Sequence, residues 1–349
     1  MSSTAIRVGI VGAGENTRKM HIPGFHAIAG VSVTAVANRS RASGERAAAQ
    51  FGIPRVFDTW EELVASDVCD AVCIGTWPYI HCPVTLAALQ AGKHVLCEAR
   101  MALNAREARR MLAAAQARPD RVAQVVPAPF TLPYDRTVQT LLKEGYLGDL
   151  LAVEVRHTQG AFLDPVAPLH WRMDAELSGL NILTMGIWYE MLMRWIGPAR
   201  KVVARTRINV PNRADAAGTI RAVHVPDHVD ILSDMACGAA ASFRFSAVTG
   251  LGASAGISLF GSEGTLVHTM TPPALRGGRR GDKTLADIPV SPGPRDCWRV
   301  EEEFIGAIRG EEPVRLTTFE DGVRYMEFTE AVARSASTGR AIELPLTGD

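Results

Sequence analysis

Two glycines that directly follow an apolar run carry the clearest chemical signal in this sequence. Gly12 and Gly14 come after residues 6–11 in "IRVGIVGAGENTR". A glycine at the first position permits a sharp turn, and one at the second lets the backbone approach a pyrophosphate closely. A helix starting there would add N–H donors and a partial positive charge. The pattern predicts a dinucleotide site, although Thr17 stands where GxGxxG has its third glycine.

The end of the second apolar run indicates which dinucleotide is bound. An NAD site usually places an acid there, which grips the ribose 2′-hydroxyl. This chain has Asn38, Arg39 and Ser40 in "VANRS" instead. A carboxylate would repel a 2′-phosphate, whereas an arginine binds one through paired charge-assisted hydrogen bonds. We therefore expect NADP or NAD, with NADP favoured; the alternative is that Arg39 is only a solvated loop residue.

Alternating apolar and helical segments must position these residues. The apolar runs are hydrophobic on both faces, as strands of a parallel sheet are when helices cover both sides. Six such runs alternate with helical segments at 41–52, 82–92 and 104–119; the runs span residues 6–11, 31–38, 56–60, 70–76, 94–99 and 121–128. This order predicts an α/β fold with a Rossmann-type, doubly wound parallel sheet in a domain covering residues 1–127.

The pattern changes after residue 127. Longer β-like runs at 149–157, 199–210, 227–248 and 256–269 lack long helices between them, which predicts a mostly antiparallel sheet. Helices are expected at 135–148, 178–197, 299–310 and 319–339, and residues 271–297 read as a loop because they are rich in Pro, Gly and Arg. We assign residues 128–349 to a second α/β domain.

Composition excludes several classes of partner. The 349 residues carry 37 basic and 37 acidic side chains, so nothing favours nucleic acid or an anionic membrane. No stretch approaches the ~18 apolar residues of a membrane span, and the N-terminus lacks a signal-peptide pattern. Six cysteines without a CxxC pair indicate reduced, buried thiols in a cytoplasmic protein. No metal site is expected, because "HVPDH" (224–228) reads as a solvated loop.

Longer motifs in the expected order over nearly the whole chain resemble one family. They are "VGAGENTRKMHIPGF", "VANRS", "GTWPYIHCPVTLAALQAGKHVLCEARMALNAREA", "LLKEGYLGDLLAVEV", "HWRMDAELSGLNILTMGIWYEMLMRWIG" and "LFGSEGTL". The family is that of glucose–fructose oxidoreductase, inositol dehydrogenase and MocA (Gfo/Idh/MocA). The resemblance implies a Rossmann domain, a C-terminal domain that binds substrate and whose large open sheet supports homodimers or homotetramers, and hydride transfer on a carbohydrate-like small molecule.

The resemblance also implies where ligands bind. The nicotinamide would lie near residues 75–81 and 98–100. The expected cofactor-binding residues are Gly12, Gly14, Asn16, Thr17, Asn38, Arg39, Ser40, Thr76, Trp77, His81 and Glu98. The expected substrate-binding residues are Arg100, Trp171, Arg172, Thr184 and Trp188. Aromatic faces suit sugar C–H faces, although these rings are equally well explained as core residues; the two arginines suggest an acidic or phosphorylated substrate.

The chain departs from this family at its catalytic positions. Family members commonly carry Glu-Lys-Pro where this sequence has Glu98-Ala99-Arg100, and an Asp and a His where it has Thr184 and Trp188. The usual proton relay is therefore expected to be absent. The remaining candidates for moving the proton are His170, Tyr189 and His81, of which His170 and His81 are also explained as surface and structural residues; Arg100 stays charged and is a poor base.

Three functions remain open. The first is an NAD(P)-dependent oxidoreductase of a sugar, sugar acid or cyclic polyol with an altered proton relay. The second is a redox-neutral or non-redox enzyme that cleaves glycosides, eliminates or isomerises. The third is a non-catalytic regulator that binds a dinucleotide or sugar. The first function predicts a net change in nicotinamide absorbance. The second predicts that product forms without that change, and the third predicts that a ligand binds but no product forms.

Overall fold

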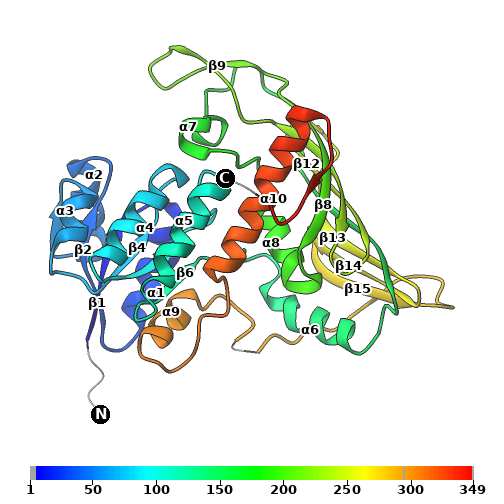
Figure 1. Ribbon diagram of the computed structural model, residues 1–349, viewed down its shortest axis with the longest axis horizontal. Coiled ribbons are helices and arrows are strands. Elements are labelled where there is room, and N and C mark those ends of the chain that lie inside the picture. Colours follow the sequence, from blue (N-terminus) through cyan, green and yellow to red (C-terminus); the bar gives the residue numbers. More distant parts are fainter. Residues whose placement is uncertain (1–4, 294, 348–349) are drawn as a thin grey trace. The chain divides into compact units, whose positions relative to one another are not determined.

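The structure is a computed structural model that describes residues 5–293 and 295–347, and the chain folds as two compact units (Figure 1). The first unit contains the chain up to Pro127 together with Arg299–Val323, and the second contains Ala128–Trp298 and the chain from Arg324 onward. The assignment of all of 128–349 to one domain was therefore wrong for Arg299–Val323.

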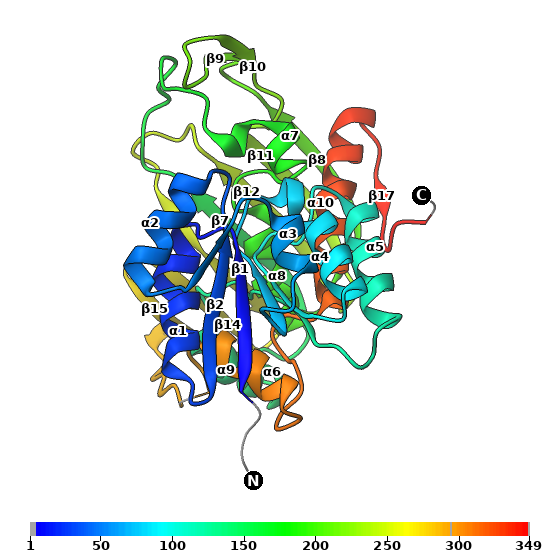
Figure 2. The same ribbon diagram turned by 90° about the vertical axis from the view of Figure 1, so that its left-hand side faces the viewer.

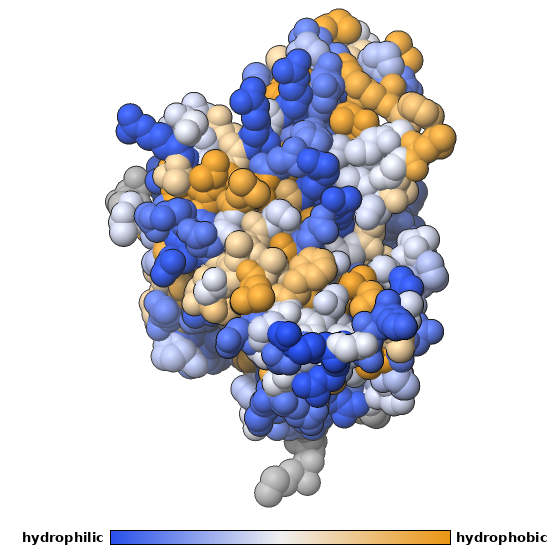
Figure 3. All heavy atoms as spheres, turned by 90° about the vertical axis from the view of Figure 1, so that its right-hand side faces the viewer, coloured by the Kyte–Doolittle hydropathy of each residue, from blue (hydrophilic) through white to orange (hydrophobic). Residues whose placement is uncertain are grey.

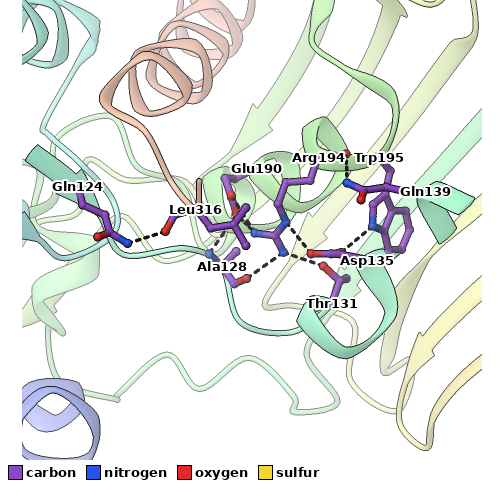
Figure 4. Close-up of polar contacts among 9 residues, drawn as sticks. All are labelled: Gln124, Ala128, Thr131, Asp135, Gln139, Glu190, Arg194, Trp195 and Leu316. Carbon is purple, nitrogen blue, oxygen red and sulfur yellow. Dashed lines mark hydrogen bonds and ion pairs between the residues drawn. The ribbon is translucent and has the colours of Figure 1, made fainter. Parts of the chain in front are cut away.

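Side-chain burial and backbone pairing explain why this segment returns to the first unit. Helix α9 (Val300–Ile308) buries Phe304, whose ring meets Phe25 edge-on with centroids 6.4 Å apart. Thr317 and Val125 exchange two backbone hydrogen bonds of 3.0 Å. The buried side chain of Gln124 donates to the Leu316 carbonyl at 2.7 Å (Figure 4). These contacts join residues about 190 to 280 positions apart, which periodicity along the chain does not reveal.

The first unit is built on a six-stranded, entirely parallel sheet, as predicted. Its strand order is β3-β2-β1-β4-β5-β6. The strands are β1 (Ile6–Val11), β2 (Val31–Ala37), β3 (Arg55–Phe57), β4 (Ala71–Ile74), β5 (His94–Cys97) and β6 (Ala123–Val125). All four residues of β4 are buried, because helices cover both faces of the sheet.

Helices lie on both sides of this sheet. Figure 2 shows α1 and α2 on one side and α3, α4 and α5 on the other. The helical elements are the π-helical turn η1 (Thr17–His21), α1 (Ile22–Ala27), α2 (Arg41–Phe51), α3 (Trp60–Ala65), the 3₁₀ turn η2 (Pro78–Ile80), α4 (His81–Gln90) and α5 (Ala105–Gln116). Polar caps start several of them: the Asn104 side chain accepts from the Glu107 N–H at the start of α5.

The second unit contains a nine-stranded sheet of order β16-β15-β14-β13-β7-β12-β11-β8-β17. Its neighbours are antiparallel except for β12 and β7, which run parallel. The strands are β7 (Leu150–Thr158), β8 (Ala199–Arg207), β11 (His228–Met235), β12 (Ala240–Ser246), β13 (Ser254–Gly261), β14 (Gly264–Met270), β15 (Pro273–Arg279), β16 (Ala286–Asp287) and β17 (Ile342–Glu343). A separate ribbon pairs β9 (Asn212–Ala214) with β10 (Ile220–Ala222).

Two predictions for this unit were wrong in detail. Residues 271–297 contain strands β15 and β16, because Leu275 is buried and the segment pairs along β14 despite its Pro and Gly content. The helix expected at 178–197 begins only at α8 (Met185–Ile196); the short helix α7 (Ala175–Ser178) ends at Gly179, which has φ +64°. A glycine adopts this positive φ without the strain that a side chain would cause there.

Helices α8 and α10 (Phe319–Thr338) cover one face of the nine-stranded sheet. The Tyr189 ring of α8 stacks on Phe328 of α10 with centroids 3.7 Å apart, and both approach Phe243 of β12. The opposite face exposes Val203 and Leu232 as a cross-strand pair. Figure 3 shows this side of the molecule, where hydrophobic residues lie among charged ones.

A buried ion network holds α8 to helix α6 (Leu132–Lys143). The Arg194 guanidinium lies 2.9 Å from Asp135 Oδ2 and 2.7 Å from Glu190 Oε2 (Figure 4). It also donates to the Ala128 carbonyl at 3.0 Å and to Thr131 Oγ1 at 2.8 Å. Burial alone would lower the pKa of Arg194, but both carboxylates outweigh this effect and raise that pKa. The network therefore fixes the chain segment that leads into α6.

No helix within residues 5–293 and 295–347 is both long and apolar enough to cross a membrane.

Candidate functional site

A cavity of about 510 Å³ lies in the first unit at the carboxyl ends of its central strands. Ligands of open parallel sheets bind at this edge. Six of the predicted cofactor-binding residues line the cavity: Gly12, Gly14, Asn38, Arg39, Thr76 and Trp77. The glycine turn, the end of β2 and the loop after β4 thus meet around a single hollow.

The glycine turn has the geometry of a pyrophosphate cradle. Gly12 has φ +85°, and a side chain there would collide with Thr76. A Cβ on Gly14 would lie 2.8 Å from the Gly75 carbonyl oxygen, which is too close for any side chain. The backbone N–H of Ala13 donates to Asn38 Oδ1 at 2.7 Å, so Asn38 ties the turn to the end of β2.

Thr17 is accommodated by a glycine elsewhere. Its side chain is buried, and a Cβ on Gly75 would collide with Thr17 Oγ1 and with the Gly12 carbonyl oxygen. The third glycine of GxGxxG normally allows close packing of helix against strand. In this chain the residue without a side chain is Gly75, in the loop after β4, and the helix keeps the side chain of Thr17.

Replacing Gly75 with alanine is expected to lower the free energy of unfolding by about 1–3 kcal/mol through overpacking, and to weaken nucleotide binding. Adding Thr17→Gly should recover part of the loss, because the contact with Gly12 remains while that with Thr17 is removed. Urea denaturation of the two single variants and the double variant measures this coupling. Strictly additive effects would contradict the compensation.

The adenosine end of the cavity is basic. The Arg39 guanidinium lies 5.5 Å from the centroid of the Trp77 ring, and Arg46 also lines the cavity. Ser40 caps α2, with its side chain accepting a hydrogen bond from the Ser43 N–H. Two acids, Asp58 and Glu61, also line the cavity, and Asp58 pairs with Arg41 at 2.9 Å. This wall can therefore bind an anionic group.

A buried charged cluster lies at the carboxyl end of β5. Asn16 Nδ2 donates to Glu98 Oε1 at 2.5 Å, and His21 Nε2 lies 3.0 Å from the same oxygen. His21 Nδ1 contacts Glu301 on α9. Burial alone would lower the pKa of His21, but hydrogen bonds to Glu301 and Glu98 raise that pKa to about 9. His21 is thus an imidazolium held between two carboxylates.

The sequence analysis missed His21 and Glu301 as members of this cluster. Burial alone would raise the pKa of Glu98, yet its hydrogen bond with His21 lowers that pKa overall. Glu98 therefore stays ionised and is fixed in place by Asn16 and His21. "MHIPGF" in the quoted motif contained the histidine, but its partner is 280 positions away.

His81 is a structural residue in this arrangement. Its ring is fully buried, with Nδ1 3.0 Å from the Arg100 carbonyl and Nε2 3.1 Å from the Thr76 carbonyl. Burial lowers its pKa. Because both ring nitrogens face backbone oxygens, His81 joins the loops after β4 and β5 and has no nitrogen left to carry a substrate proton. The side chain of Arg100 is itself buried.

Tyr189 is also poorly placed to carry a proton, and His170 lies at the surface. The Tyr189 hydroxyl accepts a hydrogen bond from the Ala199 N–H at 2.8 Å, and burial raises its pKa. His170 is exposed, and its Nδ1 accepts from the Arg172 N–H at 3.3 Å at the start of the 3₁₀ turn η3 (Trp171–Met173). The Arg172 guanidinium lies 4.3 Å from the Trp171 ring centroid.

A histidine that the sequence analysis missed lies beside Thr184 and Trp188. Thr184 Oγ1 is 2.9 Å from His157 Nδ1, and the His157 and Trp188 rings have centroids 5.5 Å apart. His157 belongs to β7, where it continues the inward-facing alternation of Val153 and Val155. That alternation in "VEVRH" was the available signal: a histidine on the apolar face of a strand. Burial lowers the pKa of His157.

The predicted site residues thus form two sets, one in each unit. Six of the predicted nucleotide-binding residues line the cavity of the first unit, and Thr184 and Trp188 meet His157 in the second. Among the described residues, no group of three or more His, Cys, Asp and Glu side chains could hold a metal ion.

Two family models match the chain. One, described as an oxidoreductase family with an NAD-binding Rossmann fold, matches residues 6–125, and the other, a GFO/IDH/MocA C-terminal domain, matches residues 136–267. Together they span most of both units.

Relatives of known activity resemble the chain along most of its length. 1,5-Anhydro-D-fructose reductase from Ensifer adhaerens is 28% identical, over 97% of this chain and 98% of its own length. Levoglucosan dehydrogenase from Pseudarthrobacter phenanthrenivorans is 24% identical, over 86% of each.

Solved structures share the fold. An oxidoreductase domain protein from Kribbella flavida superimposes with a TM-score of 0.86 at 22% identity, covering 98% of this chain and 100% of its own. A levoglucosan dehydrogenase in complex with NADH and L-sorbose has a TM-score of 0.84 at 22% identity, covering 97% and 99%.

Proposed function

Because the chain belongs to the Gfo/Idh/MocA family of NAD(P)-binding oxidoreductases, we propose that it oxidises or reduces a sugar, sugar acid or cyclic polyol. The observation that carries this proposal is the cavity beside the glycine turn. Gly12 and Gly14 leave the room a pyrophosphate needs, and Arg39 and Trp77 form the adenosine wall. When bound, the nicotinamide supplies hydride transfer, while the residues of the chain bind it, orient it and manage the proton.

The substrate class is proposed from chemistry and from relatives. Two relatives are named for the anhydrosugars 1,5-anhydro-D-fructose and levoglucosan. The Trp171 ring, with Arg172 above it, offers an apolar face for a sugar ring and a positive charge for an acidic group. A carbohydrate-like substrate, neutral or acidic, therefore fits these residues best.

An assay of a substrate panel tests the function. Purified protein is mixed with NADP or NAD and with neutral sugars, sugar acids, inositols and anhydrosugars, in both reaction directions, while nicotinamide absorbance and product are followed. A substrate-dependent absorbance change supports the proposal. Product without that change supports the redox-neutral alternative, and binding without product supports the regulator.

The altered relay is part of the proposal. Ala99 has no ionisable group, and neither Thr184 nor Trp188 exchanges a proton near neutral pH. The family's lysine, aspartate and histidine therefore have no direct chemical equivalents at these three positions. A different residue has to handle the proton if the chain catalyses net oxidation or reduction.

We predict that the protein prefers NADP and that Arg39 creates the preference. Arg39→Ala should weaken NADP binding about 10- to 100-fold, which corresponds to the loss of charge-assisted hydrogen bonds, and should change NAD binding little. Arg41→Ala is the matched control, since Arg41 pairs with Asp58 and Glu45. Fluorescence titration with both nucleotides measures the effects. Equal losses for NADP and NAD, or tighter binding of NAD by the wild type, would disprove the preference.

The proposal extends to the assembly and location of the protein. Val203, Leu232 and Phe260 are exposed on the nine-stranded sheet, which suits a homodimer or homotetramer formed through that face. Light scattering measures the mass in solution, and a monomer at micromolar concentration would exclude this assembly. Four free, buried thiols suit a cytoplasmic location: Cys69, Cys73, Cys82 and Cys97.

A further inference from the structure

We propose that His157 is the catalytic acid/base of this protein and that Thr184 is the residue that positions it. The inference rests on the proposed oxidoreductase function and deepens it, since it names the group that takes the place of the absent relay. All of the residues involved belong to the second unit.

The first observation is the use of the Thr184 hydroxyl. Thr184 directly precedes α8, where a threonine side chain ordinarily accepts a hydrogen bond from the first turn. It makes no such cap here. Its hydroxyl instead lies 2.9 Å from His157 Nδ1. The helix therefore lacks a side-chain cap. The hydrogen bond instead holds the imidazole in one orientation, with Nε2 directed away from Thr184.

The second observation is backbone strain next to this pair. Leu183 has φ +45°, and it is the one non-glycine residue within 5–293 and 295–347 that adopts a positive φ. A bulky side chain in this region costs about 1–3 kcal/mol and persists where the surroundings require it. The strained residue immediately precedes Thr184, so the fold sets the position of that hydroxyl at an energetic cost.

The third observation is an unpaired N–H beside the imidazole. Trp188 is fully buried, and its Nε1–H has no hydrogen-bond partner among the residues that the structure describes. Leaving such a donor unpaired costs about 1–3 kcal/mol. The Trp188 ring centroid lies 5.5 Å from that of His157. A ligand hydroxyl or carbonyl oxygen at this location would satisfy the indole and contact the imidazole together.

The proton step follows from this geometry. In the neutral tautomer with its proton on Nδ1, the Nδ1–H donates to Thr184 Oγ1 and Nε2 carries a free lone pair. In the oxidising direction, the C–H bond of the substrate carbinol breaks and its electron pair passes as hydride to the pyridine nucleotide. The O–H bond breaks at the same carbinol, its proton goes to Nε2, and a carbonyl forms. Reduction is the reverse, with imidazolium as the acid.

The surroundings of His157 suit a base that works near neutral pH. It contacts Thr184, which precedes α8, and Trp188 in α8. Its partners on the neighbouring strands are Phe245 and Ala255. None of these four side chains is charged or titrates near neutral pH. Burial is the cause of its lowered pKa, so the imidazole is neutral and ready to accept a proton.

The test compares His157→Asn with the wild type on the best substrate of the panel. We expect kcat to fall about 100- to 10,000-fold, while nucleotide binding by fluorescence and the unfolding temperature remain unchanged. The pH dependence of kcat on its acid side should disappear. Exogenous imidazole should restore part of the activity of His157→Gly. Thr184→Val should lower kcat more than it raises KM, and Thr184→Ser should retain most activity.

His228→Asn is the matched control, since His228 is another histidine of the same sheet, paired with Ser246 and Asp230. If the wild type turns over its substrate and the kcat of His157→Asn stays within threefold of the wild-type kcat, this inference is overturned. The proposed function then remains intact. A wild type without turnover overturns the proposed function instead. In that case ¹⁵N NMR of labelled histidine with saturating levoglucosan decides: unchanged His157 signals overturn the inference, and a tautomer change supports proton exchange with a ligand hydroxyl.

Discussion

Replacing Arg194 with methionine is expected to lower the free energy of unfolding by about 3–5 kcal/mol, because the change leaves buried carboxylates without their cation. Arg194 is nearly inaccessible and pairs with both Asp135 and Glu190. It also satisfies the Ala128 carbonyl and the Thr131 hydroxyl, so four partners lose their donor together. Urea denaturation measures the loss.

The control for this prediction is Arg244→Met. Arg244 lies 2.6 Å from Asp230, so its geometry is as close, but both side chains are about half exposed. Exposed pairs contribute about 0–1 kcal/mol because water screens them. Similar losses for Arg194→Met and Arg244→Met would show that burial does not govern the effect. Adding Asp135→Asn and Glu190→Gln to Arg194→Met should recover part of the lost free energy of unfolding, because the two buried carboxylates without a cation are then removed.

Local spacing explains why the glycine turn beside the cavity was predictable. The glycine turn needs only a strand, two glycines and a helix in succession, so the positions of Gly12 and Gly14 specify it. The same holds for Arg39, which lies two residues after the end of β2 and lines the cavity. Parallel strands with both faces buried read as continuous apolar runs, and each predicted strand of the first unit overlaps an observed one.

Long-range pairing explains what was missed. Glu301 contacts His21, which lies 280 positions away in the sequence. Arg299–Val323 packs in the first unit through contacts such as that between Phe304 and Phe25. Periodicity describes which face of an element is apolar, not which distant element covers it. His157 was missed for a related reason: its alternation with Val155 was visible in the sequence, but its pairing with Thr184 is set by how α8 crosses the sheet.

The stability of the wild type is expected to fall by about 3 kcal/mol between about pH 6.5 and pH 9 through His21 alone. Glu301 and Glu98 raise the folded-state pKa of His21 to about 9, whereas the unfolded value is about 6.5. Between these values the native state binds a proton that the unfolded state has released, so the free energy of unfolding falls as pH rises. The contribution is complete below about pH 6.5 and lost above about pH 9.

Subtracting the curve of His21→Gln isolates this contribution. The variant should be less stable than the wild type at pH 6, and the difference should shrink toward pH 9. Buried cysteines such as Cys73 also have raised pKa values and make folding less favourable at alkaline pH, but they do so in both proteins and cancel. The histidines with lowered pKa, such as His94 at about 4, act only below about pH 6.5.

The matched control for this titration is His228→Gln. His228 also faces a carboxylate, Asp230, at 3.1 Å, but its side chain is 26% exposed, so solvent screens the pair. This variant therefore controls for removing a histidine that faces a carboxylate at the surface. A constant difference between wild type and His21→Gln from pH 6 to pH 9 would mean that His21 is neutral between its carboxylates. Glu98 would then lack the cation that keeps it ionised at the end of β5.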